Sequence, residues 1–369
     1  MRNRQEHFKR NSNLELLRIL SMLMIISLHF WSNCVNLNEL PVFSSAFYFG
    51  NFIRGFSYSS VNIYVLISAY FLCKSTLRLN KLFRLWACVL FYSILGLLIA
   101  IKFGFANFSF SLLIKTITPI ASSEYWFITV YFGMYIVSPF LNIFINSLTA
   151  RKYKILLIVL TVLYILIPSI FWNSTWIGIG KGYTLSWFVY LYLVGAYIRL
   201  YYNPKILAKG DLVKIKIGCL ILAFMPLGVC IASNLATLLF FGKTTSGHDL
   251  WFNNSIIIAP LSIIIFLYFL QLSVPEKLCK SINKIALSTL AVYLIHEHPI
   301  LRTHIWEFFR QFISNNIWSL VFTYFFSIST IYILCTLIDF IRIRIFKYSI
   351  DRIGFNRIDS RLKLLSEKL

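Results

Sequence analysis

The chain has 369 residues, of which 59% are hydrophobic and only 13% are charged. A soluble domain is nearer a quarter charged, so this composition excludes an ordinary soluble enzyme and indicates an integral membrane protein. A net charge of +22 would suggest a nucleic-acid partner for a soluble protein. Basic loops on the inner side of a membrane explain the charge better, and we expect no nucleic-acid partner.

The apolar runs predict an all-α, polytopic bundle of about ten transmembrane helices. Two amphipathic stretches are expected on the outer side: 302–316, and 106–124, which either lies in the outer interface or re-enters the membrane. Residues 1–345 are predicted to form a single transmembrane domain, and residues 346–369 a basic cytoplasmic tail. The predicted helices cover residues 13–34, 51–73, 84–105, 126–147, 155–172, 184–202, 217–240, 255–274, 285–301 and 317–341.

Basic residues are distributed very unequally between the two sides of this topology. The segments assigned to the inside hold 27 of the 35 lysines and arginines, and the outer segments hold seven. Because Lys and Arg accumulate in cytoplasmic loops, this bias predicts that both termini lie in the cytoplasm. The seven cysteines are scattered and show no paired or ligand-like spacing, so we expect neither a metal site nor a disulfide framework.

The first predicted helix carries Arg18 and His29 within an apolar run. Eleven residues make about three turns, so both side chains lie on one helix face, about 16 Å apart along the axis. Ionisable groups inside a membrane segment are costly and mark functional sites. The alternative is that Arg18 extends to the headgroups and His29 is a hydrogen-bonded packing residue.

Glu15 precedes this pair by one turn of helix. The stretch Ser12-Asn13-Leu14-Glu15 reads as a capping box, with Ser12 as the N-cap residue. A direct chemical role for Glu15 is the competing interpretation.

Arg78, Lys81 and Arg84 are spaced three residues apart before the third predicted helix. If that helix begins early, they form a cationic ridge suited to a phosphate-bearing ligand. Ordinary positive-inside charge is the simpler explanation.

His296, Glu297 and His298 are consecutive near the end of the ninth predicted helix. Consecutive helical residues point about 100° apart, so they cannot all face one site. Imidazole and carboxylate groups suit proton transfer, although polar residues at an outer interface need no such role. Trp126, at the start of the fourth predicted helix, is an expected interface residue and an alternative platform for a sugar.

Several stretches together resemble the membrane-bound acyltransferase-3 family. NLELLRILSMLMIISLHF is similar to the family's opening helix and carries its Arg-x10-His pattern on Arg18 and His29. VNIYVLISAYFL resembles a second family helix, with Ala69 where Gly is usual. LNKLFRLW resembles the family's Arg-x-x-Arg helix start, with Lys81 in the first position and Arg84 in the second. YWFITVYFGMYIVSPFLN and LSTLAVYLIHEHPILR resemble two later family segments, and all five occur in the family's order.

The resemblance implies an O-acyltransferase, most simply an O-acetyltransferase for a surface polysaccharide, capsule or lipid-linked glycan. Acetyl-CoA or another acyl-CoA would be a co-substrate, and no cofactor is expected to stay bound. The family pattern implies that Arg18, Lys81 and Arg84 hold the CoA phosphates. It implies that His29 acts as general base or transient acyl carrier, with Glu15 or a residue of the ninth helix orienting it. His296, Glu297 and Trp126 are candidates for proton relay or acceptor binding. The implied location is the bacterial cytoplasmic membrane.

Three other functions fit a polytopic chain. A carrier or flippase for lipid-linked saccharides would also need buried polar residues and a cationic site, but not an Arg and a His three turns apart. A glycan polymerase is expected to have a large outer loop, and the predicted outer loops are short. Buried ionisable residues argue against a purely structural or sensory protein. Acyl-CoA binding separates the acyltransferase from all three.

Overall fold

The computed structural model describes residues 11–37, 40–171, 176–202, 209–242, 251–314 and 316–350. These residues form helices and no strand, which confirms the all-α prediction. Both chain ends, on which the predicted cytoplasmic termini depend, lie outside the described residues. Within the described residues, seven helical segments are long and apolar enough to cross a membrane: Ser12–Cys34, Leu79–Lys102, Trp126–Asn146, Ala150–Ile170, Asp211–Phe241, Glu276–His296 and Ile317–Tyr348.

Shorter helices stand where the other three spans were predicted. The range 51–73 is occupied by α2 (Ser45–Ser57) and α3 (Ser59–Leu72), and two further predicted spans by α9 (Leu185–Tyr201) and α11 (Ile258–Gln271). Helix α3 packs against α1, α9 and α11, and almost all of its residues are buried. A helix that is apolar all round belongs in the interior of a bundle, so α3 forms the centre of this one.

Helix α1 (Ser12–His29) begins one residue before the predicted start. The predicted capping box is wrong, because Asn11 is the N-cap residue and its side chain accepts hydrogen bonds from the amides of Asn13 and Leu14. Glu15 is therefore free of any capping role. The α-helix ends at His29 and continues as a π-helix, η1 (Phe30–Cys34). Such wide turns are frequent at functional sites.

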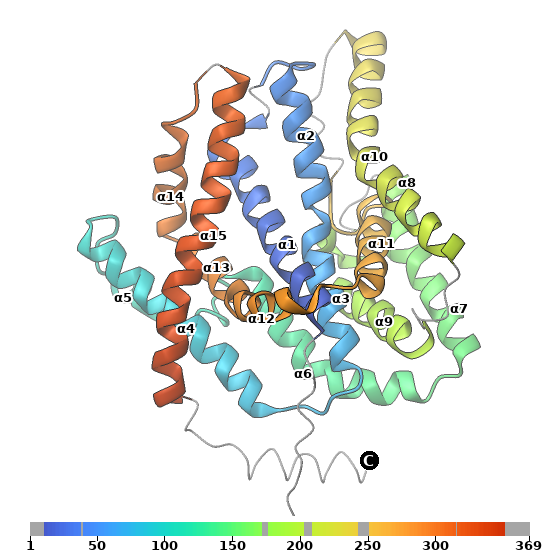
Figure 1. The fold of residues 1–369 in the computed structure, drawn as a ribbon, viewed down its shortest axis with the longest axis horizontal. Coiled ribbons are helices and arrows are strands. Elements are labelled where there is room, and N and C mark those ends of the chain that lie inside the picture. The colour runs from blue at the N-terminus through green and yellow to red at the C-terminus, as the bar shows by residue number, and fades with distance from the viewer. Residues whose placement is uncertain are drawn as a thin grey trace, which may run out of the picture.

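The predicted helix 285–301 is wrong at both ends. The chain forms α12 (Glu276–Ile285), the 3-10 turn η7 (Ala286–Ser288) and α13 (Thr289–His296), and it then turns before α14 (Leu301–Arg310). In Figure 1, α12 runs crosswise to the long C-terminal helix α15 (Ile317–Tyr348). Apolar and basic residues alternate along α12 with helical period, which suits a helix lying at the membrane surface.

The remaining helices enclose α1. On one side α1 packs against α2, α3 and α11, and on the other against α12, α13 and α15, so it crosses the interior of the bundle (Figure 1). Helix α4 begins at Leu79, five residues before the predicted start, which places Lys81 and Arg84 in its first two turns. The other elements are α4 (Leu79–Lys102), α5 (Phe110–Ile117), α6 (Trp126–Asn146), α7 (Ala150–Thr161), η3 (Val162–Leu166), α8 (Ile167–Ile170), η4 (Trp176–Gly178), η5 (Gly180–Gly182) and α10 (Lys209–Phe241).

Candidate active site

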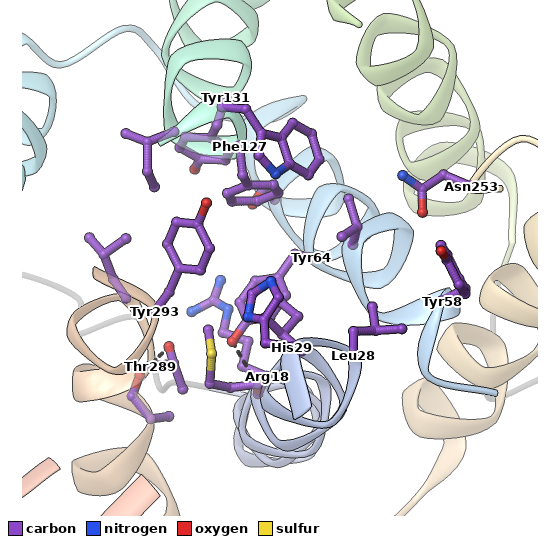
Figure 2. Close-up of a pocket in the computed structure, with 18 of the residues that line it drawn as sticks. Arg18, Leu28, His29, Tyr58, Tyr64, Phe127, Tyr131, Asn253, Thr289 and Tyr293 are labelled. Atoms are coloured by element: carbon purple, nitrogen blue, oxygen red, sulfur yellow. Dashed lines mark hydrogen bonds between the residues drawn. The ribbon is translucent and has the colours of Figure 1, made fainter. Parts of the chain in front are cut away.

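A cavity of about 430 Å³ lies beside α1 and is lined by the three ionisable residues of that helix, Glu15, Arg18 and His29. Arg18 and His29 line this cavity, as their spacing on one helix face predicts. Figure 2 shows them among aromatic side chains from α3, α6 and α13, including Tyr64, Phe127 and Tyr293. We call this space the reaction cavity. Its wall combines aliphatic and aromatic surface with polar groups from α1 and from several tyrosines, and these polar groups interact more strongly there than in bulk water.

His29 is in contact with two residues from the far end of the chain. Its Nδ1 atom lies 2.9 Å from Nε2 of His296 and 3.3 Å from Oε1 of Glu297. The second carboxylate oxygen of Glu297 lies 3.6 Å from a guanidinium nitrogen of Arg302. We call His29, His296 and Glu297 the reaction cluster. The packing of α1 against α13 creates it, since the two helices are far apart in sequence.

The hydrogen bonds fix the tautomers of the two imidazoles. Nδ1 of His296 lies 2.5 Å from the carbonyl oxygen of Val292, which can only accept, so this nitrogen carries the proton. Nε2 of His296 is then an acceptor, and Nδ1 of His29 donates to it. This leaves Nε2 of His29 with a free lone pair, on a ring that lines the reaction cavity.

Glu297 reaches His29 because the helix has already ended. Helix α13 stops at His296, and Glu297 has a non-helical backbone (φ −102°, ψ 17°). The rule that consecutive residues point 100° apart no longer applies there, and two members of the trio meet His29. Oε1 of Glu297 is buried and accepts no hydrogen bond. His298 faces away, since its Nε2 donates to the carbonyl oxygen of Ser93 in α4, at 3.2 Å.

Arg18 marks the opposite end of the reaction cavity, where it forms an ion pair with Glu15 at 3.1 Å. Glu15 lies fourteen residues before His29, about 21 Å along the helix, so it cannot orient that imidazole directly. A second cavity, of about 230 Å³, contains Lys81 and shares Arg18 with the reaction cavity. The structure therefore brings Arg18 and Lys81 to adjoining spaces. Arg84 is exposed on α4 and lines neither of these two cavities.

Trp126, Tyr183 and Tyr58, which we call the aromatic group, line the reaction cavity but not the smaller cavity that contains Lys81. The rings of Trp126 and Tyr183 meet edge to face, with centroids 4.6 Å apart. Tyr58 and Asn253 line the same space, and Figure 2 shows these two side by side. Sequence reasoning named only Trp126, because the other three come from segments with no motif that singles them out.

The reaction cluster is also the set of residues that a metal ion would need. Its three ligand atoms all lie within 4.8 Å of one another, and two imidazoles with one carboxylate suit several divalent ions. Spacing in the sequence could not reveal such a set, because His29 comes from a different helix. Each of the three residues makes at least one of the contacts already described, and Arg302 adds positive charge beside the carboxylate.

These features define a class of protein: a multi-pass helical membrane protein with an internal cavity, a histidine on its wall that is held by a second histidine and a carboxylate, and two cations where this cavity adjoins a smaller one. The comparison with known families agrees with this description. The sequence model of the acyltransferase-3 family, described as "Acyltransferase domain", matches residues 11–338. The chain belongs to this family and is an acyltransferase. No curated protein and no solved structure shows a significant match.

Proposed function

We propose that the chain transfers an acyl group, most simply acetyl, from acyl-CoA to a hydroxyl of a surface polysaccharide or its lipid-linked precursor. The observation that carries this proposal is the reaction cluster, in which His29 is held by a second histidine and a carboxylate while its ring lines a cavity that also contains Arg18. The positive-inside rule assigns that end to the cytoplasm, and we place the protein in the bacterial cytoplasmic membrane.

The donor enters at the cationic end. Arg18 and Lys81 supply positive charge where the two cavities adjoin, and CoA carries phosphates at the end opposite its thioester. Arg18 and His29 stand about 16 Å apart along α1, and the long pantetheine arm of CoA spans that interval. Charge at the inner mouth and the reacting group in the interior therefore match the two ends of the donor.

His29 acts as general base in this scheme. Its Nε2 atom takes the proton from the acceptor hydroxyl while the hydroxyl oxygen attacks the thioester carbonyl carbon. The carbon–sulfur bond breaks, and His29 returns the proton to the departing CoA thiolate. The positive charge on the imidazole is transient. Oε1 of Glu297 stabilises it, since this oxygen lies 3.3 Å from Nδ1 and accepts no hydrogen bond from the described residues.

The aromatic group receives the acceptor. Edges and faces of aromatic rings suit the apolar faces of sugars, and Trp126 and Tyr183 present both. Tyr58 and Asn253 add groups that exchange hydrogen bonds with hydroxyls. A glycan hydroxyl held here faces the donor thioester with His29 between the two binding regions.

The test is acyl transfer and acyl-CoA binding by the purified chain in nanodiscs. His29→Ala is expected to bind acyl-CoA normally and to lose transfer by roughly 10²–10⁴-fold, the usual contribution of a general base. Arg18→Ala is expected to weaken binding. The matched controls are His304→Ala, at a half-buried position, and Arg151→Ala, at an exposed one. They remove the same residue types from outside the described cavities, and both should behave as wild type.

Each result has an opposite that would overturn the scheme. Full transfer by His29→Ala in folded protein would refute the role of His29. Absence of acyl-CoA binding by folded wild type would favour a saccharide carrier. Rapid quenching during turnover with labelled acyl-CoA separates general-base catalysis from a covalent mechanism. Label found on His29 would mean an acyl-histidine intermediate.

A further inference from the structure

A third cavity lies between the crosswise helix α12 and the long helix α15. Its volume is about 360 Å³. We call it the α12/α15 groove, and its lining residues are Lys284, Leu287, Leu337, Phe340, Ile341, Ile343 and Arg344. It contains none of the residues assigned to the proposed donor and acceptor regions, and Leu287 is the residue that it shares with the reaction cavity.

The groove combines two cations with an apolar wall and has no acidic residue in its lining. Lys284 places its ammonium 5.0 Å from the centre of the Phe340 ring, and no ion pair holds Lys284 or Arg344 within the part of the chain that the structure describes. The neighbouring Arg342 differs, because it is paired with buried Asp339. The two groove cations therefore remain available to an anion.

The apolar part of the groove is exposed on the outside of the bundle. Leu287, Leu337 and Ile341 are 44%, 54% and 64% exposed, and α15 is one of the helices long enough to cross a bilayer. A free inorganic anion would satisfy the cations but leave this wall uncovered. A lipid that carries a phosphate above its acyl chains matches both parts at once.

We propose that the α12/α15 groove binds an anionic phospholipid of the leaflet at the basic end of the bundle. Its phosphate lies between Lys284 and Arg344, and an acyl chain lies along the leucine and isoleucine side chains. Leu287 lines both the groove and the reaction cavity, so the bound lipid packs against the outer side of a residue that forms the wall of the reaction cavity. The same segment leads directly into α13, which carries His296.

The experiment measures binding of phosphatidylglycerol and phosphatidylcholine to the detergent-purified full chain by native mass spectrometry. The double variant Lys284→Ala/Arg344→Ala should lose about thirtyfold in affinity for phosphatidylglycerol, as expected for two cations near a lipid phosphate. The matched control is Lys277→Ala/Lys280→Ala. It removes the same amount of positive charge from two exposed residues of α12 that lie outside the groove. This control should bind as wild type does.

A second variant tests the groove without changing charge. Leu337→Trp fills the apolar part at an exposed position and should also weaken phosphatidylglycerol binding. Equal losses in both double variants would show general surface attraction and overturn the proposal, as would unchanged binding in Lys284→Ala/Arg344→Ala. Displacement of bound phosphatidylglycerol by millimolar inorganic phosphate would show a simple anion site and would overturn the phospholipid assignment.

Discussion

Replacing Gly96 by alanine tests whether the turn that carries Glu297 positions the reaction cluster. Gly96 lies in α4 against the ring of His298, the residue that follows Glu297. A methyl group at position 96 would lie 2.3 Å from both Cδ2 and Nε2 of that ring, more than an ångström short of ordinary van der Waals contact. Either the ring or the helix must move.

The ring of His298 has little freedom to move. Its Nε2 donates to the carbonyl of Ser93, and its Nδ1 accepts from the amides of Ile300 and Leu301 at the start of α14. Overpacking of this kind typically costs about 1–3 kcal/mol. Because Glu297 is bonded to His298 along the backbone, the displacement reaches the reaction cluster, where a shift of about 1 Å can lower the rate roughly 10²-fold.

The assay compares acyl transfer and the thermal midpoint of Gly96→Ala with those of Gly133→Ala. The control replaces a glycine of α6 whose added methyl group would meet nothing closer than 3.6 Å, so helix propensity alone should leave its stability unchanged or raised. In the background of His298→Ala, alanine at position 96 should have little further effect, since the clash is gone. Wild-type transfer and stability in Gly96→Ala would refute the reasoning.

Two further predictions concern the reaction cluster and the buried ion pair of α15. Incubation with a strong chelator should leave acyl transfer by the purified protein unchanged, because hydrogen bonds and an ion pair already account for the cluster; loss of activity that zinc restores would instead identify a metal centre. Asp339→Asn should destabilise the fold by roughly 3–5 kcal/mol, since it leaves the guanidinium of Arg342 without its buried partner. Asp211→Asn removes an exposed ion pair and should lower the free energy of unfolding by less than about 1 kcal/mol. The measurement is the denaturation midpoint of each of these two variants in detergent. Equal midpoints would contradict the second prediction.

Much of the fold could be read from the sequence because lipid restricts the choice of structure. A chain in a bilayer must satisfy its backbone hydrogen bonds locally, so long apolar runs such as that of α15 have to be helices. The errors lie where tertiary contacts compete with periodicity. The capping box of α1 was wrong because Asn11, one residue earlier, already caps the helix. The segment 276–296 is broken at η7, where the chain passes from a surface helix into the bundle.

The candidate site divides in the same way. The sequence by itself determined that Arg18 and His29 share one face of a helix, because helical periodicity is a local property. Only the tertiary structure decided that His296 and Glu297 together contact His29, since this depends on where α13 ends and how it packs on α1. Local rules describe a single element, whereas a reaction cluster is made by the distances between elements. Those distances are set by the packing of the whole bundle.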